Sequence, residues 1–455
     1  MKLIYLFLSL TFLIIGCKKF VDVEEPKTQL LGESIFTSNA TAHAAQLAIY
    51  TTMESDLFGY HIILYPGLSG DELINYSSAS NLVDLSSVNL TPENSSVQSF
   101  WTNLYKYIYQ ANNILEGVSI STSLSETTVK QLTGEAKFVR AFCHFYLTRF
   151  YGEIPIVNLT DYRITSQLPR RPENEVADFI ENDLNDAVQL LPDYFTGGTG
   201  VMTTERVRPT RSAALALLAR VKLYRNDWTG AENNATSVIN NPQFSIVTDM
   251  NNVFLKNSKE AILQWMGVST RTNTPAGAGF ILTTTPSASA LDSNLVKSFN
   301  PIDKRKANWL KSITVGSKSY WFPYKYKQGN NTTTITEYTM VLRLAEQYLI
   351  RAEALARQGK LNEALSDLNV IRSRAGLPDL SNLTQQAIID SIQQERRYEL
   401  FTEFADRWLN LRRVGNIDQI IGATKGPNWQ STDALYPIPQ TEINRNNNLS
   451  QNAGY

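Results

Sequence analysis

A mainly α-helical fold built from helix pairs is predicted by two stretches of the sequence that repeat each other. Residues 208–240 and 343–374 each contain an amphipathic helix, a short turn and a second helix. At one constant offset, apolar or small residues of the two copies coincide: Ala219 with Ala352, Trp228 with Leu361, Ala231 with Ala364 and Val238 with Ile371. Helix pairs that bury their faces by stacking in this way are typical of tetratricopeptide repeats.

Weaker helix pairs earlier in the chain are expected to extend this scaffold. Apolar periodicity between residues 41 and 189 indicates about four amphipathic helices, among them 101–118 and 129–151. The second of these is expected to stop at Gly152, because glycine commonly terminates helices. A set of unrelated helical hairpins is the alternative.

Loop-rich segments divide the chain into parts. Residues 242–340 are rich in Thr, Ser, Asn, Gly and Pro, with a few short strand-like runs such as EAILQWMGV and SYWFPYKY. Residues 67–99 are similarly polar and loop-like, and long loops are usually functional. We therefore predict an N-terminal helical part (41–241), an irregular ligand-binding face (242–340) and a C-terminal part with the second helix pair and an irregular tail (341–455).

The first residues predict a lipoprotein signal peptide. Lys2 precedes an apolar run that is shorter than the about 20 residues needed to cross a bilayer. The run ends in IIGC, an order that resembles the lipobox of bacterial lipoproteins. We expect removal of residues 1–16, lipid on Cys17, and a tether over 17–40. A plain signal peptide with an incidental cysteine is the alternative.

Charge and composition exclude several classes of function. The 42 Lys and Arg residues balance 43 Asp and Glu residues, so no nucleic-acid-binding surface or polybasic membrane patch is expected. The three histidines, His43, His61 and His144, show no metal-ligand spacing. Cys143 lies among aromatic residues, which is typical of a buried, unreactive thiol. We predict no metal, no cofactor and no catalytic nucleophile.

One acidic cluster raises the question of catalysis. Within QQERRYELFTEFADRWLNLRR, Glu395, Glu399 and Glu403 recur at helical spacing and could approach the roughly 5 Å carboxylate separation of a retaining glycosidase. However, five arginines are interleaved with them, and a carboxylate beside a guanidinium group stays ionised. Ion pairs that lock two helices are therefore favoured over a general acid.

The aromatic residues divide into core and surface candidates. Three tryptophans fall on apolar helix faces and are expected in the core: Trp101, Trp228 and Trp408. Tyr76, Tyr320 and Trp321 lie in or beside polar loops, where a flat ring can stack on the C–H face of a sugar. Each of these rings could instead cap the scaffold from outside.

Six stretches in order along the chain resemble the SusD/RagB outer-membrane lipoproteins. They are FVDVEEP, WTNLYKYIYQANNIL, GEAKFVRAFCHFYLTRFYGEIPIV, RLAEQYLIRAEAL…NVIRSRAGL, ERRYELFTEFADRW…LRR and the closing YPIPQTEINRNNNLSQNAGY, which is the most specific. The resemblance implies a tetratricopeptide-like fold with an irregular ligand-binding face and no catalytic activity. It also implies a lipid-anchored place on the outer membrane, facing the exterior, as a lid on a SusC-like TonB-dependent transporter. The ligands of the family are oligosaccharides, or peptides in the RagB branch.

The family marks its ligand site by no fixed motif, so the site residues remain candidates. We expect the site to draw on the loop after Asp71 and on the irregular middle region, with these contacts: Asp71, Asn75, Tyr76, Tyr320 and Trp321. Few aromatics occur between Asn75 and Ser99, which disfavours a broad stacking platform for a long helical glucan.

Two departures from the family pattern stand out. Lys18 and Lys19 directly follow the cysteine, where family members often carry acidic residues. Phe404 follows Glu403, where the family has a small glycine, and this difference is expected to change packing rather than function.

Overall fold

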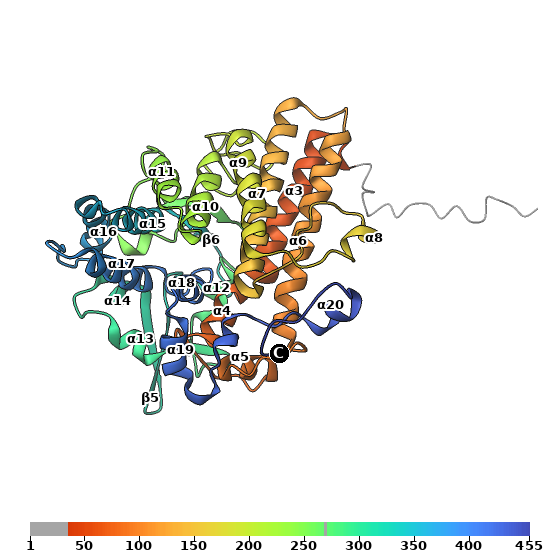
Figure 1. Ribbon diagram of the computed structural model, residues 1–455. Helices are drawn as coiled ribbons and strands as arrows, with labels where there is room; N and C mark the ends of the chain where they lie inside the picture. Colours follow the sequence, from red (N-terminus) through yellow and green to blue (C-terminus); the bar gives the residue numbers. More distant parts are fainter. Residues whose placement is uncertain (1–34, 268–270) are drawn as a thin grey trace, which may run out of the picture.

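Helices dominate the computed structural model, which describes residues 35–267 and 271–455 (Figure 1). In the first half of the chain, four long helices pack side by side in this order, each against the next: α3 (Asn39–Met53), α6 (Ser95–Ile120), α7 (Glu126–Tyr151) and α9 (Glu173–Leu190). These four helices form the start of a row that continues through the molecule.

The two repeat copies continue this row. The first copy forms α10 (Arg211–Tyr224) and α11 (Trp228–Ile239), and the second forms α15 (Leu344–Arg357) and α16 (Leu361–Arg374). Helix α10 packs against α9 and α11 packs against α15, so the pairs stack in chain order, and α17 (Gln385–Leu400) follows. Equivalent helices of the two copies begin at matching positions. The predicted tetratricopeptide-like scaffold is therefore confirmed.

Local sequence sets the ends of the long helix α7. The Ser125 hydroxyl accepts a hydrogen bond from the Thr128 amide and caps its first turn. At the other end, Gly152 adopts φ +73°, a conformation that glycine reaches at little steric cost. The predicted end of this helix at Gly152 is confirmed.

Among residues 35–267 and 271–455, three short antiparallel strand pairs lie outside the helical row. They are β1 (Leu73–Asn75) with β3 (Ser289–Leu291), β2 (Ala261–Trp265) with β6 (Thr339–Arg343), and β4 (Leu310–Val315) with β5 (Lys318–Pro323). The run EAILQWMGV forms β2, and all residues of β2 and β6 are buried. The segment 242–340 thus supplies part of the core as well as surface, because both faces of these strands are covered.

The segment 67–99 is more ordered than its polar composition predicts. Helix α4 (His61–Ser69) reaches into it, β1 follows, and α5 (Ser80–Ser87) forms where we expected a loop. Leu85 is the one fully buried residue of α5. A helix with a single buried position leaves no apolar period in the sequence, which explains why the loop prediction was wrong there.

The remaining helical elements are short and lie between these parts or in the C-terminal tail. They are η3 (Glu54–Phe58), α8 (Tyr162–Thr165), η4 (Met250–Asn252), α12 (Pro275–Phe280), α13 (Ser293–Ser298), α14 (Lys304–Trp309), α18 (Asp406–Arg413), α19 (Ile417–Lys425), η5 (Gly426–Asn428), η6 (Ser431–Ala434) and α20 (Gln440–Arg445). Element η3 is a π-helical turn that directly continues α3, and such turns occur frequently at functional sites.

The core contains most of the residues that periodicity assigned to it. Trp101 and Trp408 are buried, as predicted, whereas Trp228 is only partly buried and its ring contacts the Arg357 guanidinium group. Cys143 is fully buried in α7, and burial raises the pKa of its thiol well above the usual value, as expected for an unreactive cysteine.

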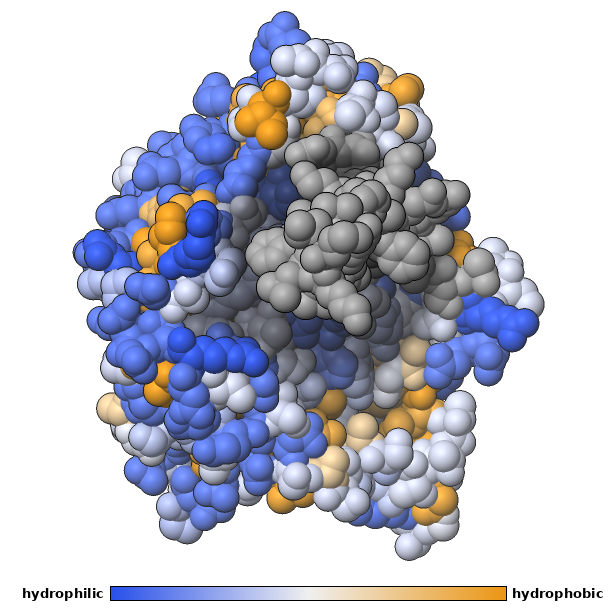
Figure 2. Space-filling view, turned by 90° about the vertical axis from the view of Figure 1, so that its right-hand side faces the viewer, coloured by the Kyte–Doolittle hydropathy of each residue, from blue (hydrophilic) through white to orange (hydrophobic). Residues whose placement is uncertain are grey.

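Neither the helices nor the visible surface of the described residues shows a long apolar stretch. No helix among them is long and apolar enough to cross a membrane. On the face that looks to the right in Figure 1, hydrophobic residues visible around the grey atoms form small separate groups on a mostly hydrophilic surface (Figure 2).

Candidate ligand-binding site

The structure brings Tyr76 and Tyr320 together from distant parts of the chain. Tyr76 directly follows β1, and its amide donates a hydrogen bond to the Ala288 carbonyl at 2.9 Å, which extends the pairing of β1 with β3. Tyr320 lies in β5, which packs against β3. The centroids of the two rings are 5.6 Å apart and their planes meet at 76°. Both side chains are half-buried, so one part of each ring faces solvent.

Lys318 completes this surface. Its Nζ lies 5.3 Å from the ring centroid of Tyr76 and 5.2 Å from that of Tyr320, within cation–π range of both. Lys318 and Tyr320 are two residues apart in β5 and therefore point to the same side of the strand. We call Tyr76, Tyr320 and Lys318 the aromatic edge. The alternation of side chains within SYWFPYKY (319–326) could have shown that Tyr320 and Trp321 point to opposite sides of a strand. It could not have indicated Lys318, which lies just before that run.

Trp321 and Asn75 are neighbours in sequence of the two tyrosines of the aromatic edge, but their side chains make other contacts. Trp321 follows Tyr320 in β5, so its side chain points to the opposite side, where it is partly buried against the hydrophobic core. The Asn75 side chain accepts a hydrogen bond from the Ser77 amide and donates one to the Ser77 carbonyl, both at 3.0 Å. Asn75 therefore shapes the turn that presents Tyr76.

Asp71 lies two residues before β1 and is buried. Its side chain is 7% exposed and its carboxylate accepts hydrogen bonds from Arg397 of α17 and Arg407 of α18, at 2.7–2.9 Å. Burial alone would raise the pKa of Asp71, but the two guanidinium groups outweigh it and hold the pKa below the usual value. The ionised Asp71 thus anchors the start of β1 to the C-terminal helices.

A second feature that sequence reasoning missed is a pocket between η3 and α12. It has a volume of about 440 Å³ and is lined by Glu54, Ser55, Tyr60, His61, Gly267, Thr272, Pro275, Ala278 and Gly279. The Glu54 side chain is almost fully buried, and its Oε1 accepts a hydrogen bond from the Thr339 hydroxyl at 3.1 Å. Burial raises the pKa of Glu54 to about 7. We call this the Glu54 pocket.

Tyr60 of the Glu54 pocket lies next to the strand pair β1–β3, which leads to Tyr76 of the aromatic edge. Burial raises the pKa of Tyr60 to about 12, and the neighbouring hydroxyl of Ser289 partly offsets that shift. Ser289 belongs to β3 and pairs with Asn75 of β1. No sequence signal marks the pocket, because a π-helical turn has no distinct periodicity and His61 lies far along the chain from the other two histidines.

The acidic cluster forms buried ion pairs, as predicted, and this arrangement is unsuited to acid catalysis. Glu399 is fully buried and contacts Arg343, Arg374 and Arg305. Burial would raise its pKa, but these three guanidinium groups together hold the pKa well below the usual value. A carboxyl group in this environment stays ionised, whereas a general acid must hold a proton near neutral pH.

The partners of the cluster differ from the expected ones. Glu395 pairs with Arg305 and Arg372, and Glu403 pairs with Arg343 and Lys325. The interleaved arginines bind other acids: Arg396 binds Asp406 and Glu346, Arg397 and Arg407 bind Asp71, Arg412 binds Glu173, and Arg413 binds Glu353. The three glutamates therefore pair with cations outside this stretch, and among the described residues the one ion pair within it joins Arg396 to Asp406.

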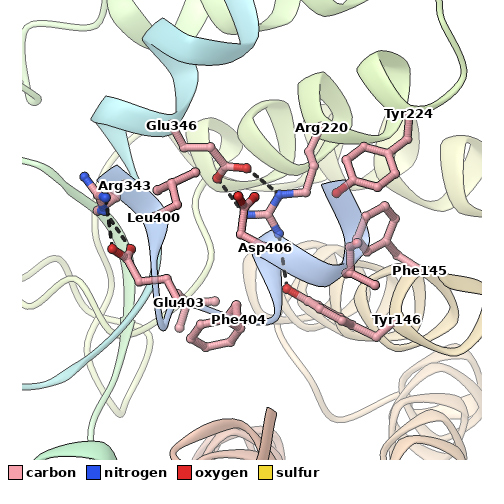
Figure 3. Close-up of a pocket in the computed structure, with 12 residues that line it drawn as sticks. Phe145, Tyr146, Arg220, Tyr224, Arg343, Glu346, Leu400, Glu403, Phe404 and Asp406 are labelled. Carbon is pink, nitrogen blue, oxygen red and sulfur yellow. Dashed lines mark hydrogen bonds and ion pairs between the residues drawn. The ribbon is translucent and has the colours of Figure 1, made fainter. Parts of the chain in front are cut away.

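The interior beside this network offers no room for a ligand. Figure 3 shows Arg220 held between Glu346 and the Tyr146 hydroxyl, and Arg343 paired with Glu403, around a cavity of about 20 Å³. That volume accommodates about one water molecule. The polar groups in Figure 3 therefore serve the packing of the helices against each other.

Phe404 occupies the position of the expected family glycine. It has a positive φ of 43°, which L-residues other than glycine seldom adopt, and its side chain is buried. Its ring stacks on Phe58 at 5.8 Å and approaches Trp265 at 6.0 Å. Phe404 thus contributes an aromatic side chain to the core at this position, and an effect on packing relative to the family remains a prediction.

Among residues 35–267 and 271–455, no three His, Cys, Asp or Glu side chains are grouped so that they could hold a metal ion. Burial lowers the pKa of His43 to about 4 and that of His144 to about 3. Both imidazoles are therefore neutral at physiological pH. His144 is fixed by a hydrogen bond with the Arg140 carbonyl, and His43 by one with Arg208.

Comparison with protein families identifies the class of protein that this fold and surface belong to. One family, described as starch-binding and associating with the outer membrane, matches residues 19–223, and a second, described as the SusD family, matches residues 303–455. The chain belongs to the SusD/RagB family, as the sequence resemblance indicated.

Two curated relatives illustrate this membership. The SusD-like protein P2 of Formosa agariphila is 27% identical, with 99% of each chain covered. The starch-binding protein SusD of Bacteroides thetaiotaomicron is 36% identical over 127 residues, which cover 25% of this chain and 21% of that protein.

Solved structures share the fold at low sequence identity. A SusD superfamily protein from Bacteroides vulgatus has a TM-score of 0.81 at 20% identity, covering 92% of this chain and all of that one. A laminarin-binding SusD-like protein has a TM-score of 0.74 at 22% identity, covering 91% and 99%. The surface glycan-binding protein A of Bacteroides uniformis has a TM-score of 0.77 at 21% identity, covering 90% and 99%.

Proposed function

We propose that the protein captures oligosaccharides at the aromatic edge and breaks no bond in them. Membership of a family described as starch-binding carries this proposal, and structural neighbours named for laminarin and glycan binding support it. The chemistry of the aromatic edge is suitable. Two half-exposed tyrosine rings can stack on the C–H faces of sugar units, and their hydroxyl groups can bond to sugar hydroxyls.

The candidate contacts have different roles in this proposal. Tyr76 and Tyr320 contact the glycan directly, and Asn75 holds the turn that positions Tyr76. Asp71 and Trp321 support the surface from beneath, Asp71 through its arginines and Trp321 through the core. A stacking surface of two rings suits a short or flexible sugar segment better than a long helical glucan.

Loss of both tyrosine rings is expected to weaken glycan binding strongly. Truncation of an aromatic side chain at the centre of a binding surface costs more than about 1 kcal/mol, so Tyr76→Ala with Tyr320→Ala should lower affinity by about tenfold or more. Affinity electrophoresis against a panel of polysaccharides measures this. Tyr162→Ala is the matched control, because Tyr162 is 76% exposed on α8, far from β5 in Figure 1.

The same panel separates glycan capture from the alternative, a peptide-binding lid of the RagB type. If the unmutated protein is retarded by no polysaccharide but binds short peptides tightly, the peptide function replaces the glycan function. If glycans bind and the double variant binds them as well as the unmutated protein does, the aromatic edge is not the site.

We further propose that the protein is anchored on the exterior of the outer membrane through lipid on Cys17 and acts as a lid on a SusC-like TonB-dependent transporter. Cys17 lies outside the described residues, and family membership supports this part of the proposal. The bound glycan would then be passed to the transporter for import.

The anchor and the transporter partner can be tested together. The protein is expected to copurify with a transporter barrel from detergent-solubilised outer membranes. In cells that lack the transporter, Cys17→Ala should move the protein from the membrane to the soluble fraction, while the purified variant still binds glycan. A variant that still sediments with those membranes would contradict the lipid anchor.

A further inference from the structure

The Glu54 pocket contains a buried carboxylate without a compensating charge. Within residues 35–267 and 271–455, the Glu54 carboxylate accepts a hydrogen bond from the Thr339 hydroxyl and forms no ion pair. This differs from Asp71 and Glu399, which are similarly buried but contact two and three guanidinium groups. A buried carboxylate is costly to ionise unless a cation accompanies it.

The other polar groups of the pocket do not supply that cation. The His61 Nδ1 lies 3.1 Å from the Asp56 carbonyl, and burial lowers the pKa of His61, so the imidazole is neutral at physiological pH. Tyr60 and Ser55 are neutral hydroxyl groups on the same wall. The pocket therefore combines one carboxyl group, which a bound cation would help to ionise, with neutral hydrogen-bonding groups and an aromatic ring.

Two glycines pack closely against the Tyr60 and Glu54 side chains that line the pocket. A Cβ atom added at Gly279 would lie 2.3 Å from the Tyr60 ring, and one added at Gly267 would lie 3.2 Å from Glu54 Oε2. At both positions the backbone therefore packs closely against Tyr60 and Glu54, which only glycine allows. The pocket that these residues line has a volume of about 440 Å³, within the range of small-molecule sites.

We propose that the Glu54 pocket binds a protonated amine of the captured ligand, with the Glu54 carboxylate as the counter-ion. This inference rests on the proposed capture function and adds a second, charge-selective subsite beside the aromatic edge, across the β1–β3 strand pair. The amine belongs either to an amino sugar or to the free amino terminus of a peptide. The Tyr60 ring offers a cation–π surface to the same group.

Two ligand pairs that differ only at the amine test the proposal by calorimetry at about pH 7. The first pair is a glucosamine tetramer and its fully N-acetylated form, and the second is trialanine and N-acetyl-trialanine. We expect the free amine of at least one pair to bind about tenfold or more tightly than its acetylated partner. A preference within the sugar pair assigns the pocket to an amino sugar, and one within the peptide pair assigns it to a peptide terminus.

Glu54→Gln is expected to abolish that preference while it keeps the side-chain volume and an oxygen for the Thr339 hydroxyl. Glu72→Gln is the matched control, because Glu72 is equally buried but does not line the pocket, and it should leave the preference unchanged. Equal binding of free and acetylated ligands in both pairs would overturn the proposal, as would a preference that survives Glu54→Gln. Retention of the Glu54→Gln variant by a neutral polysaccharide shows that it is folded and tests the aromatic edge separately.

Discussion

Replacement of Glu399 by Gln is expected to destabilise the protein by about 3–5 kcal/mol, the usual cost of removing one partner from a buried ion pair. Glu399 is the shared acceptor of Arg305, Arg343 and Arg374, and all four side chains are almost fully buried. A neutral amide would leave three desolvated guanidinium groups with one carboxylate fewer. Urea unfolding at pH 7 measures the change.

Glu363→Gln is the control for this experiment, because Glu363 is exposed on α16. A change below about 1 kcal/mol for Glu399→Gln, within the range of an exposed pair, would contradict the structural role. Release of reducing sugar by the unmutated protein would also contradict a purely structural role. The glycosidase hypothesis requires Glu395, Glu399 or Glu403 to act as a general acid.

The sign of the pH dependence follows from the lowered pKa of Glu399. Because the folded pKa lies well below the unfolded value of about 4.5, the stabilisation by Glu399 is fully present above that value. It is lost as the pH falls toward the folded pKa. The stability difference between the unmutated protein and Glu399→Gln should therefore shrink only in acid, below about pH 4.5.

Glu72→Gln is expected to show the opposite pH dependence. Burial, followed by the charge of Asp71, raises the pKa of Glu72 to about 8, although its oxygens accept hydrogen bonds from the Thr402 amide. A group with a raised folded pKa contributes stability that is present below the unfolded pKa and is lost as the pH rises through the folded pKa. The variant carries no such ionisation, so its stability relative to the unmutated protein should increase from pH 5 to pH 9, by up to about 4 kcal/mol.

Comparison of the variant with the unmutated protein is essential here, because other groups titrate in the same range. Burial lowers the pKa of Lys325 and of Lys425 to about 8, and both shifts change the stability of the unmutated protein above neutral pH. The contribution of Lys425 is common to the two proteins and largely cancels in the difference, whereas the charge of Lys325 lowers the pKa of Glu72 and is therefore part of the measured effect. Urea unfolding at several pH values measures it, with Glu363→Gln as the control. A difference that stays constant from pH 5 to pH 9 would show that Glu72 ionises as it does in the unfolded chain.

The helical scaffold could be predicted from the sequence because its signals are local. Small residues such as Ala219 and Ala352 recur at one offset in the two helix pairs, and each pair must bury an apolar face. Helix α5 and the burial of β2 could not be predicted in this way. A short helix with one buried residue has no period, and a five-residue apolar run does not reveal whether it lies at the surface or in the core.

The candidate site was only partly predictable because it depends on contacts between distant segments. Tyr76 and Tyr320 were both expected at a polar surface, but their proximity arises from the packing of β3 against β5. The same limit explains why the ion-pair partners predicted for the acidic cluster were wrong. Spacing placed Glu399 near the arginines of its own stretch, whereas its actual partners come from three other segments of the chain. Glu54 carried no signal at all, since nothing in the sequence shows that an acid lacks a counter-charge.

The buried ring of Phe404 links the backbone of one turn to the composition of the core. A glycine at this position would hold a positive φ by itself, whereas phenylalanine must be kept there by its contacts with Phe58 and Trp265. The turn and these aromatic side chains therefore cannot diverge independently during evolution. Descendants that replace Trp265 by a smaller residue should tend to regain glycine at position 404, and this paired substitution would be visible among related sequences.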